Sequence, residues 1–295
     1  MIAYIFLTLA LAGGLIKGFS GKRVSRDVTT LYDGFLVNTL RTFFAAAIGF
    51  AVAISSVGAS EFALTPLSFL VCLSSSLFMA LFSICWLYAY KSEAYVFLSV
   101  FTMLASVVTG FLGRIIYGDE LKLTRLIGFA LLFVALYIMS FYNKSISGKI
   151  SKKAAFTLIL GGIGAALSDF MQKVYTKENL GDVSVFTFYT YFLMLLPQIS
   201  VIIFFSTKKA ERNPVLLDKR HILIFFVMSA ALYLNVLTKT LAARDIPATQ
   251  MYPTLQGANL VASAILAALL FKERITLKSA AGIAVALIAV VFMNM

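Results

Sequence analysis

Ten long apolar runs are the feature that most constrains the fold of this chain. Each is about 20 residues long, and a helix of that length crosses the ~30 Å hydrocarbon core of a bilayer. The predicted spans are residues 2–20, 34–56, 67–89, 94–116, 123–142, 154–176, 183–206, 221–242, 247–270 and 277–294. The connectors are short, so no soluble catalytic or nucleotide-binding domain fits between the spans.

Composition favours helices over strands for these runs. Hydrophobic residues make up 61% of the 295 residues and charged residues only 13%, about half the charge of a soluble domain. Backbone polar groups in hydrocarbon must be paired within a helix or a closed barrel, and barrel strands alternate apolar and polar residues. The continuous runs therefore predict an all-α polytopic membrane protein with ten transmembrane helices.

The net charge of +12 fits cytoplasmic loops facing anionic lipid headgroups, so we expect membrane lipids and not nucleic acid as partners. The odd-numbered loops carry most of the Lys and Arg residues, which places them in the cytoplasm and both termini outside. Relatives of the family named below are more often drawn with both termini in the cytoplasm. The orientation stays open at this stage.

An internal repeat divides the chain into two halves. Residues 117–123 align with residues 271–277 at an offset of 154, and the same offset places Gly128 on Gly282. The predicted domains are a first five-helix repeat over 1–142, a basic linker over 143–153 and a second five-helix repeat over 154–295. Because five spans are an odd number, the second repeat enters the membrane in the opposite orientation, which is a transporter architecture.

These repeated segments resemble the EamA-like branch of the drug/metabolite transporter superfamily. The pattern is a short polar segment, residues 89–94, followed by an acidic turn and Gly128, with a second copy at residues 243–248, 271–275 and Gly282. The resemblance implies ten helices in two inverted repeats, a central substrate cavity, and export or import of small metabolites without ATP hydrolysis. Lys17 and Arg41 also lie where that family often has a Lys and an Arg.

Charged residues inside the spans are candidate site residues, because each costs about 2.5 to 3.5 kcal/mol at the bilayer centre. Arg41 and Asp169 are the deepest. Asp169 can pair with Lys173 at i+4 as a structural ion pair, or it can line the cavity as a cation partner or a proton-coupling carboxylate. Lys17, Lys173 and Lys239 lie nearer the span ends, where a long side chain can also reach the interface.

The ninth span carries a polar stripe formed by Tyr252, Gln256, Asn259 and Ser263 at helical spacing. Such a stripe either hydrogen-bonds neighbouring helices or faces a wet substrate cavity. Pro253 can break the helix where a cavity is lined, so we expect a substrate site here.

Several further residues complete the candidate set. Asn235, Tyr189 and Trp86 are substrate-binding candidates on the eighth, seventh and third spans. Gly14 and Gly18 form a G-x-x-x-G pair that predicts close packing of the first span. His221 is expected to face solvent or headgroups.

Missing motifs narrow the function. The sequence has no phosphate-binding G-x-x-x-x-G-K-[ST] loop, no H-E-x-x-H and no Cys/His cluster, so we expect neither an enzyme nor a cofactor or metal site. We expect a secondary transporter that moves a small polar or amphipathic metabolite by alternating access, with possible proton or exchange coupling, in the plasma (inner) membrane. The alternatives are a lipid-linked sugar flippase and a membrane scaffold.

Overall fold

Ten α-helices and two short 3₁₀ turns form the described part of the chain. The computed structural model describes residues 2–24, 27–91, 95–140, 152–208, 213–271 and 277–295, and these contain no strand. The helices are α1 (Ile2–Val24), α2 (Leu31–Val57), α3 (Pro66–Lys91), α4 (Tyr95–Tyr117), α5 (Leu123–Ser140), α6 (Lys152–Lys177), α7 (Val183–Thr207), α8 (Lys219–Asp245), α9 (Ala248–Phe271) and α10 (Leu277–Asn294), with 3₁₀ turns η1 (Ala59–Phe62) and η2 (Pro214–Leu217).

Each of the ten predicted spans coincides with a helix to within a few residues. Five described helices or parts of helices are long and apolar enough to cross a membrane: Ile2–Gly21, Leu31–Val57, Pro66–Cys85, Val183–Thr207 and Lys219–Asp245. Helices α4, α5 and α10 contribute shorter described apolar stretches. The fold is therefore that of an all-helical polytopic membrane protein.

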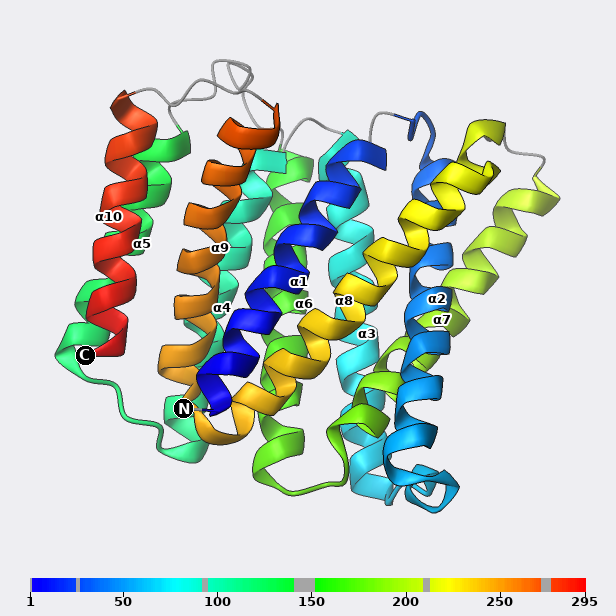
Figure 1. Ribbon diagram of the computed structural model, residues 1–295, viewed down its shortest axis with the longest axis horizontal. Helices are drawn as coiled ribbons and strands as arrows, with labels where there is room; N and C mark the ends of the chain where they lie inside the picture. The colour runs from blue at the N-terminus through cyan, green and yellow to red at the C-terminus, as the bar shows by residue number, and fades with distance from the viewer. Residues whose placement is uncertain (1, 25–26, 92–94, 141–151, 209–212, 272–276) are drawn as a thin grey trace.

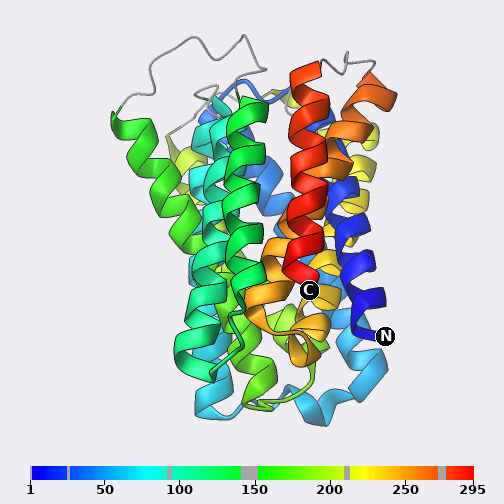
Figure 2. The same ribbon diagram turned by 90° about the vertical axis from the view of Figure 1, so that its left-hand side faces the viewer.

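The helices stand side by side and alternate in direction (Figures 1 and 2). One end of the bundle holds the turns at residues 118–122, 178–182 and 246–247. We call it the lower end, because it is at the bottom of Figure 1. Both chain termini lie in the lower half of that view. Helix α1 starts at the lower end, whereas α6 starts at the upper end, so the two predicted halves enter the bundle in opposite directions.

Helix packing follows a regular pairing. Helix α1 packs along α8 and α6 packs along α3, while α2 packs on α7, α4 on α9 and α5 on α10. The counterpart of each helix in the first half is the helix five places later, so that α1 corresponds to α6 and α3 to α8. Exchanging counterparts turns the α1–α8 pair into the α6–α3 pair and leaves the other three pairs unchanged. This is the packing that the predicted repeat requires; the repeat itself and its domain boundaries stay predictions.

Small residues bring the helices close together in the interior, and large apolar residues cover the outside. Ala10, Ala242 and Ala243 are fully buried where α1, α8 and α9 meet, in keeping with the small residues that membrane helices use at their contacts. By contrast, Leu277 is 88% exposed and Ile115 76% exposed. Such an outer surface suits lipid rather than water.

Local sequence signals set the helix ends. Thr30 and Asp33 form a capping box at the start of α2, with the Thr30 nitrogen donating to Asp33 Oδ2 at 2.9 Å and the Asp33 nitrogen to Thr30 Oγ1 at 3.1 Å. After α4 the chain turns at Gly118, whose φ of 68° favours glycine. That turn positions Asp119 at the lower end.

Candidate functional site

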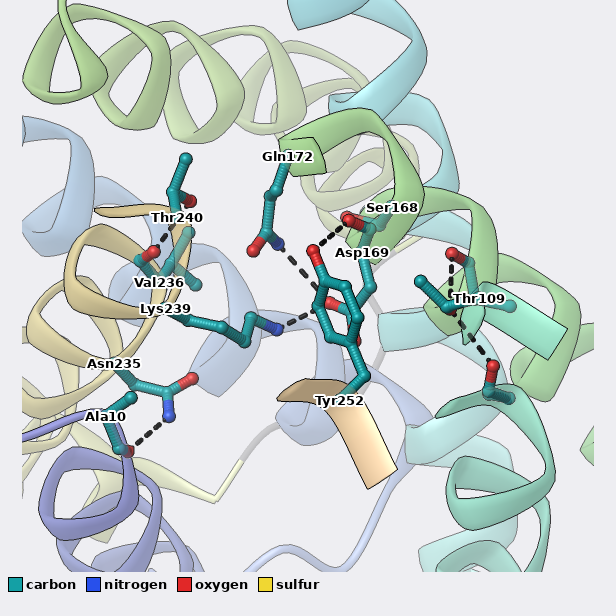
Figure 3. Close-up of polar contacts among 12 residues, drawn as sticks. Ala10, Thr109, Ser168, Asp169, Gln172, Asn235, Val236, Lys239, Thr240 and Tyr252 are labelled. Carbon is teal, nitrogen blue, oxygen red and sulfur yellow. Dashed lines mark hydrogen bonds and ion pairs between the residues drawn. The ribbon is translucent and has the colours of Figure 1, made fainter. Parts of the chain in front are cut away.

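An ion pair between α6 and α8 lies at the centre of the candidate site. Lys239 Nζ is 2.5 Å from Asp169 Oδ1, and the two side chains are only 13% and 14% exposed. Figure 3 shows the Lys239 side chain extending from α8 toward the Asp169 carboxylate. Because removing either partner would leave a largely desolvated charge, each stabilises the other.

Two further side chains bind Asp169. Tyr252 on α9 is 1% exposed and donates from its hydroxyl to the Asp169 backbone carbonyl at 2.5 Å (Figure 3). Gln172 donates from Nε2 to Asp169 Oδ1 at 3.3 Å. The Lys239 ammonium also lies 6.0 Å from the centroid of the Tyr252 ring, at the outer limit of a cation–π contact. Asp169 thus joins α6, α8 and α9.

The predicted pairing of Asp169 with Lys173 is wrong. Lys173 is 1% exposed, and its ammonium donates to the backbone carbonyls of Ala243 and Ile246, each at 2.8 Å. These carbonyls belong to the C-terminal end of α8, where unpaired carbonyls and the helix dipole attract a cation. The i, i+4 spacing makes the Asp169 pair possible, but packing of α6 against the end of α8 directs Lys173 there instead.

Lys17 and Arg41 bring the first half of the chain to the same region. Lys17 on α1 is half-buried and interacts electrostatically with Arg41, Lys239 and Asp169. Arg41 on α2 is 8% exposed, donates from Nη2 to Asn38 Oδ1, and its backbone carbonyl accepts a hydrogen bond from Ser229 Oγ on α8 at 2.8 Å. The charged residues predicted from both halves therefore meet in space.

Two asparagines approach α1 at Gly14. Asn235 on α8 donates from Nδ2 to the Ala10 carbonyl at 2.5 Å (Figure 3). A Cβ atom at Gly14 would lie 3.1 Å from Asn259 Oδ1 and 3.4 Å from Asn235 Nδ2. Asn259 is half-buried and makes no hydrogen bond within the described part of the chain. Its amide is available to a solute or to water.

At the lower end, polar contacts join the α4–α5 turn and the first turn of α5 to α9. Asp119 Oδ2 accepts a hydrogen bond from the Ala248 backbone nitrogen at 2.6 Å. Arg125, which is 6% exposed, donates to Thr249 Oγ1 at 2.8 Å and to Gln250 Oε1 at 3.0 Å. These contacts fasten the start of α9 to the first half of the chain.

Residues 152–295, which include the Asp169–Lys239 pair and all of α9, match the family described as "EamA-like transporter family". The chain belongs to this family. It is a membrane transporter of the drug/metabolite type, and the predicted resemblance is confirmed.

One solved structure extends the likeness of this EamA-like transporter to the whole bundle. It is titled "Crystal structure of protein", has a TM-score of 0.78 at 12% sequence identity, and is matched over 98% of this chain and 95% of its own. At that identity the likeness shows the shared fold alone. No curated protein sequence matches the chain.

Three other predicted residues lie apart from the charged cluster or outside the described side chains. Tyr189 donates from its hydroxyl to the Phe62 carbonyl at 2.9 Å and packs against the rings of Phe62 and Phe188. It therefore fastens the 3₁₀ turn η1 to α7. The side chains of Trp86 and Ser263 lie outside those that the structure describes.

Helix α9 of this EamA-like transporter is continuous through Pro253, so the predicted break in the helix is wrong. Pro253 cannot donate a hydrogen bond to the carbonyl of Thr249. Membrane helices tolerate such a loss where neighbouring groups satisfy the freed backbone group. Gln256, one turn further on, is half-buried and makes no hydrogen bond among the described residues. The polar stripe thus includes one buried member, Tyr252, and two members with free amides, Gln256 and Asn259.

Two smaller predictions are also corrected. His221 is 9% exposed rather than solvated, with Nε2 3.0 Å from Asp27 Oδ2. Gly18 has open space around it, whereas a Cβ at Gly13 would lie 2.7 Å from the Ala231 carbonyl oxygen. The close helix contact of α1 is therefore centred on Gly13 and Gly14, because α8 crosses α1 there.

A pocket of about 280 Å³ opens at the lower end of the bundle. Its lining comprises Tyr175, Thr176, Asn179, Gly181, Val183 and Arg244. The predicted site residues are not among them. The pocket lies beside the α6–α7 turn, whereas the predicted residues gather around Asp169.

Proposed function

We propose that this EamA-like transporter is a secondary transporter that moves a small polar or amphipathic metabolite across the plasma membrane by alternating access. The observation that carries the proposal is the Asp169–Lys239 ion pair, which lies among α6, α8 and α9 with Lys17 and Arg41 beside it. Ionisable residues inside a membrane bundle mark solute or ion pathways because they are costly to keep there.

Free polar groups beside the pair support a solute site. Gln256 and Asn259 are half-buried and make no hydrogen bond within the described residues. A solute that displaces water from these amides can form hydrogen bonds with them in its place. The contacts of Asp119 and Arg125 with the start of α9 join the two halves of the chain at the lower end. Contacts between the two halves at one end, together with a polar centre, are features expected of one state of an alternating-access cycle.

The test is transport by purified protein in sealed proteoliposomes. A thermal-shift screen of amino acids, nucleosides, sugars and amines selects solutes, and counterflow of a labelled solute is then measured without ATP. Counterflow that requires the protein and is lost when α9 residues are replaced supports the proposal. Movement of a fluorescent lipid analogue, without counterflow of any soluble compound, would instead support a flippase.

A further inference from the structure

The pocket of about 280 Å³ at the lower end of the bundle is lined by the ends of three helices. Tyr175 and Thr176 belong to the last turn of α6, Val183 is the first residue of α7, and Arg244 lies in the last turn of α8. Helix α6 has 26 residues, a length of about 39 Å, whereas the hydrocarbon core of a bilayer is about 30 Å thick. The pocket therefore lies at the level of the lipid headgroups.

A glycine and two buried side chains shape the pocket. Tyr175 is 1% exposed and Thr176 is 7% exposed, so they form its inner wall. Gly181, in the turn between α6 and α7, has a φ of 138°, and a Cβ atom there would lie 2.7 Å from Tyr175 Oη. The turn can approach α6 this closely only because residue 181 is a glycine.

Arg244 carries the one charge in the described lining of the pocket. It is exposed and makes no hydrogen bond or ion pair with any residue that the structure describes. Its guanidinium group always carries its charge and has five N–H donors. An arginine in this situation is available to an anion.

The acidic residues near the pocket are directed elsewhere. The Glu178 carboxylate accepts a hydrogen bond from Tyr117 Oη on α4 at 3.2 Å, and Asp182 Oδ1 accepts one from the Ser184 nitrogen at 2.7 Å. Neither of these acids lines the pocket, and nor does Asp245 at the end of α8. The described lining therefore has one positive charge and no negative charge.

Asn179 supplies a second hydrogen-bond donor. It is exposed, and its side chain makes no hydrogen bond within the described ranges. The hydroxyl groups of Tyr175 and Thr176, by contrast, already donate to backbone carbonyls. The free donors of the pocket are therefore the Arg244 guanidinium and the Asn179 amide, and a ligand group rich in acceptor oxygens would satisfy both.

We propose that this pocket binds a phosphate group, with Arg244 as its main anchor and Asn179 as a second hydrogen-bond donor. A guanidinium group matches two phosphate oxygens at once, and basic pockets between transmembrane helices bind anionic headgroups. The phosphate can come from a phospholipid or from a soluble phosphate ester, so the test separates these sources. The site lies apart from Asp169 and is independent of the proposed transport function.

The test measures the melting temperature of the purified protein in detergent at constant ionic strength. The probes are two pairs that differ only in a phosphate group: glycerol 3-phosphate with glycerol, and dihexanoylphosphatidic acid with dihexanoylglycerol. At least one phosphate compound should raise the melting temperature, because a bound phosphate joins the end of α8 to the α6–α7 turn. Its partner without phosphate should not. A response to the lipid alone identifies a headgroup site, and a response to glycerol 3-phosphate alone identifies a site for a soluble ester.

Substitutions identify the groups that bind the phosphate. Arg244→Gln should weaken binding by about tenfold or more, because hydrogen bonds from a charged group are lost, and Arg244→Lys should retain part of the affinity. Asn179→Gly, which removes the amide and accepts the backbone φ of 50°, should weaken binding less. Lys177→Gln and Arg220→Gln are matched controls, because both residues are exposed and lie outside the pocket. Neither control should change binding.

A further variant distinguishes the pocket from an exposed arginine alone. Val183→Phe places a ring in the pocket and leaves Arg244 unchanged, so phosphate binding should be lost. Three results with the other proteins would overturn the proposal: no response to either phosphate compound, an equal response to the compounds without phosphate, and equal losses of affinity in Arg244→Gln and Arg220→Gln. Unchanged binding in Val183→Phe would place the phosphate outside the pocket and would also overturn it.

Discussion

The Asp119 carboxylate accepts a hydrogen bond from the Ala248 backbone nitrogen at 2.6 Å, and so binds the turn after α4 to the first turn of α9. The first backbone N–H groups of a helix have no partner within the helix. Ala248 is 0% exposed, so water cannot replace this partner. Asp119 therefore acts as a cap supplied from another part of the chain, and its negative charge suits the positive end of the helix dipole.

Replacing Asp119 by alanine is expected to lower the free energy of unfolding by about 1 kcal/mol, the usual cost of losing a helix cap. Asp119→Asn should retain most of the stability because its amide oxygen can accept the same hydrogen bond. The measurement is thermal unfolding in detergent. Glu120→Ala is the matched control, since Glu120 is exposed and contributes its backbone carbonyl to the contacts with Arg125 and Thr249. Equal losses in the two alanine variants would contradict the capping role.

A proton-coupled mechanism predicts that Asp169→Asn abolishes solute accumulation in proteoliposomes but leaves solute exchange. The asparagine cannot take up and release a proton, whereas exchange needs no net proton movement. The same change leaves Lys239 without its ionic partner, and breaking a largely buried pair costs about 3 to 5 kcal/mol. The double variant with Lys239→Gln should recover part of that stability. Unchanged accumulation in Asp169→Asn would remove this carboxylate from the coupling mechanism.

Alanine in place of Gln256 or Asn259 is expected to weaken solute binding by about 1 kcal/mol each, roughly fivefold, if each amide bonds the solute. Thermal stability should change little, because neither amide bonds the protein within the described residues. Gln250→Ala is the opposite control on the same helix. Its amide bonds Tyr4, Asn294 and Arg125, so stability should fall while affinity is kept. Loss of stability with intact affinity in the Gln256 and Asn259 variants would show that these residues hold helices together.

Gly13→Ala is expected to destabilise the protein, because the added Cβ would lie 2.7 Å from the backbone carbonyl oxygen of Ala231 and force α1 away from α8. Overpacking of this kind costs about 1 to 3 kcal/mol. Gly18→Ala meets no atom within 4 Å and should be neutral or stabilising by up to about 1 kcal/mol, from the better helix propensity of alanine. Detergent melting curves of the two variants provide the comparison, and a Gly18→Ala variant less stable than Gly13→Ala would refute the close contact at Gly13.

The helices of this protein are predictable because their signal is local. A run of about 20 apolar residues forms a helix in a membrane whatever its neighbours are, since its backbone has no other partners. The charges at the centre are predictable for a related reason. Asp169, Arg41 and Lys17 are costly in an apolar run, which singles them out before any contact is known.

The partners of these charges depend on helix rotation and register, which local sequence does not encode. The i, i+4 rule applies equally to Lys173 and to any other basic residue one turn away, yet Lys173 faces the end of α8 and Lys239 reaches Asp169 from a different helix. Arg125 and Asp119 lie near span ends and read as ordinary loop charges in the sequence. Their contacts with α9 become visible only once the two halves are packed together.

The α8–α9 turn is held from both sides by charges of opposite sign, with Lys173 on the last carbonyls of α8 and Asp119 on the first nitrogen of α9. Ile246 and Ala248 in this turn are 4% and 0% exposed. Loops between helices usually accept extra residues because they lie at the surface. This one offers no such freedom: an epitope tag inserted after Ile246 would separate both charges from the groups they bind, so tags and reporters belong at another connection of this protein.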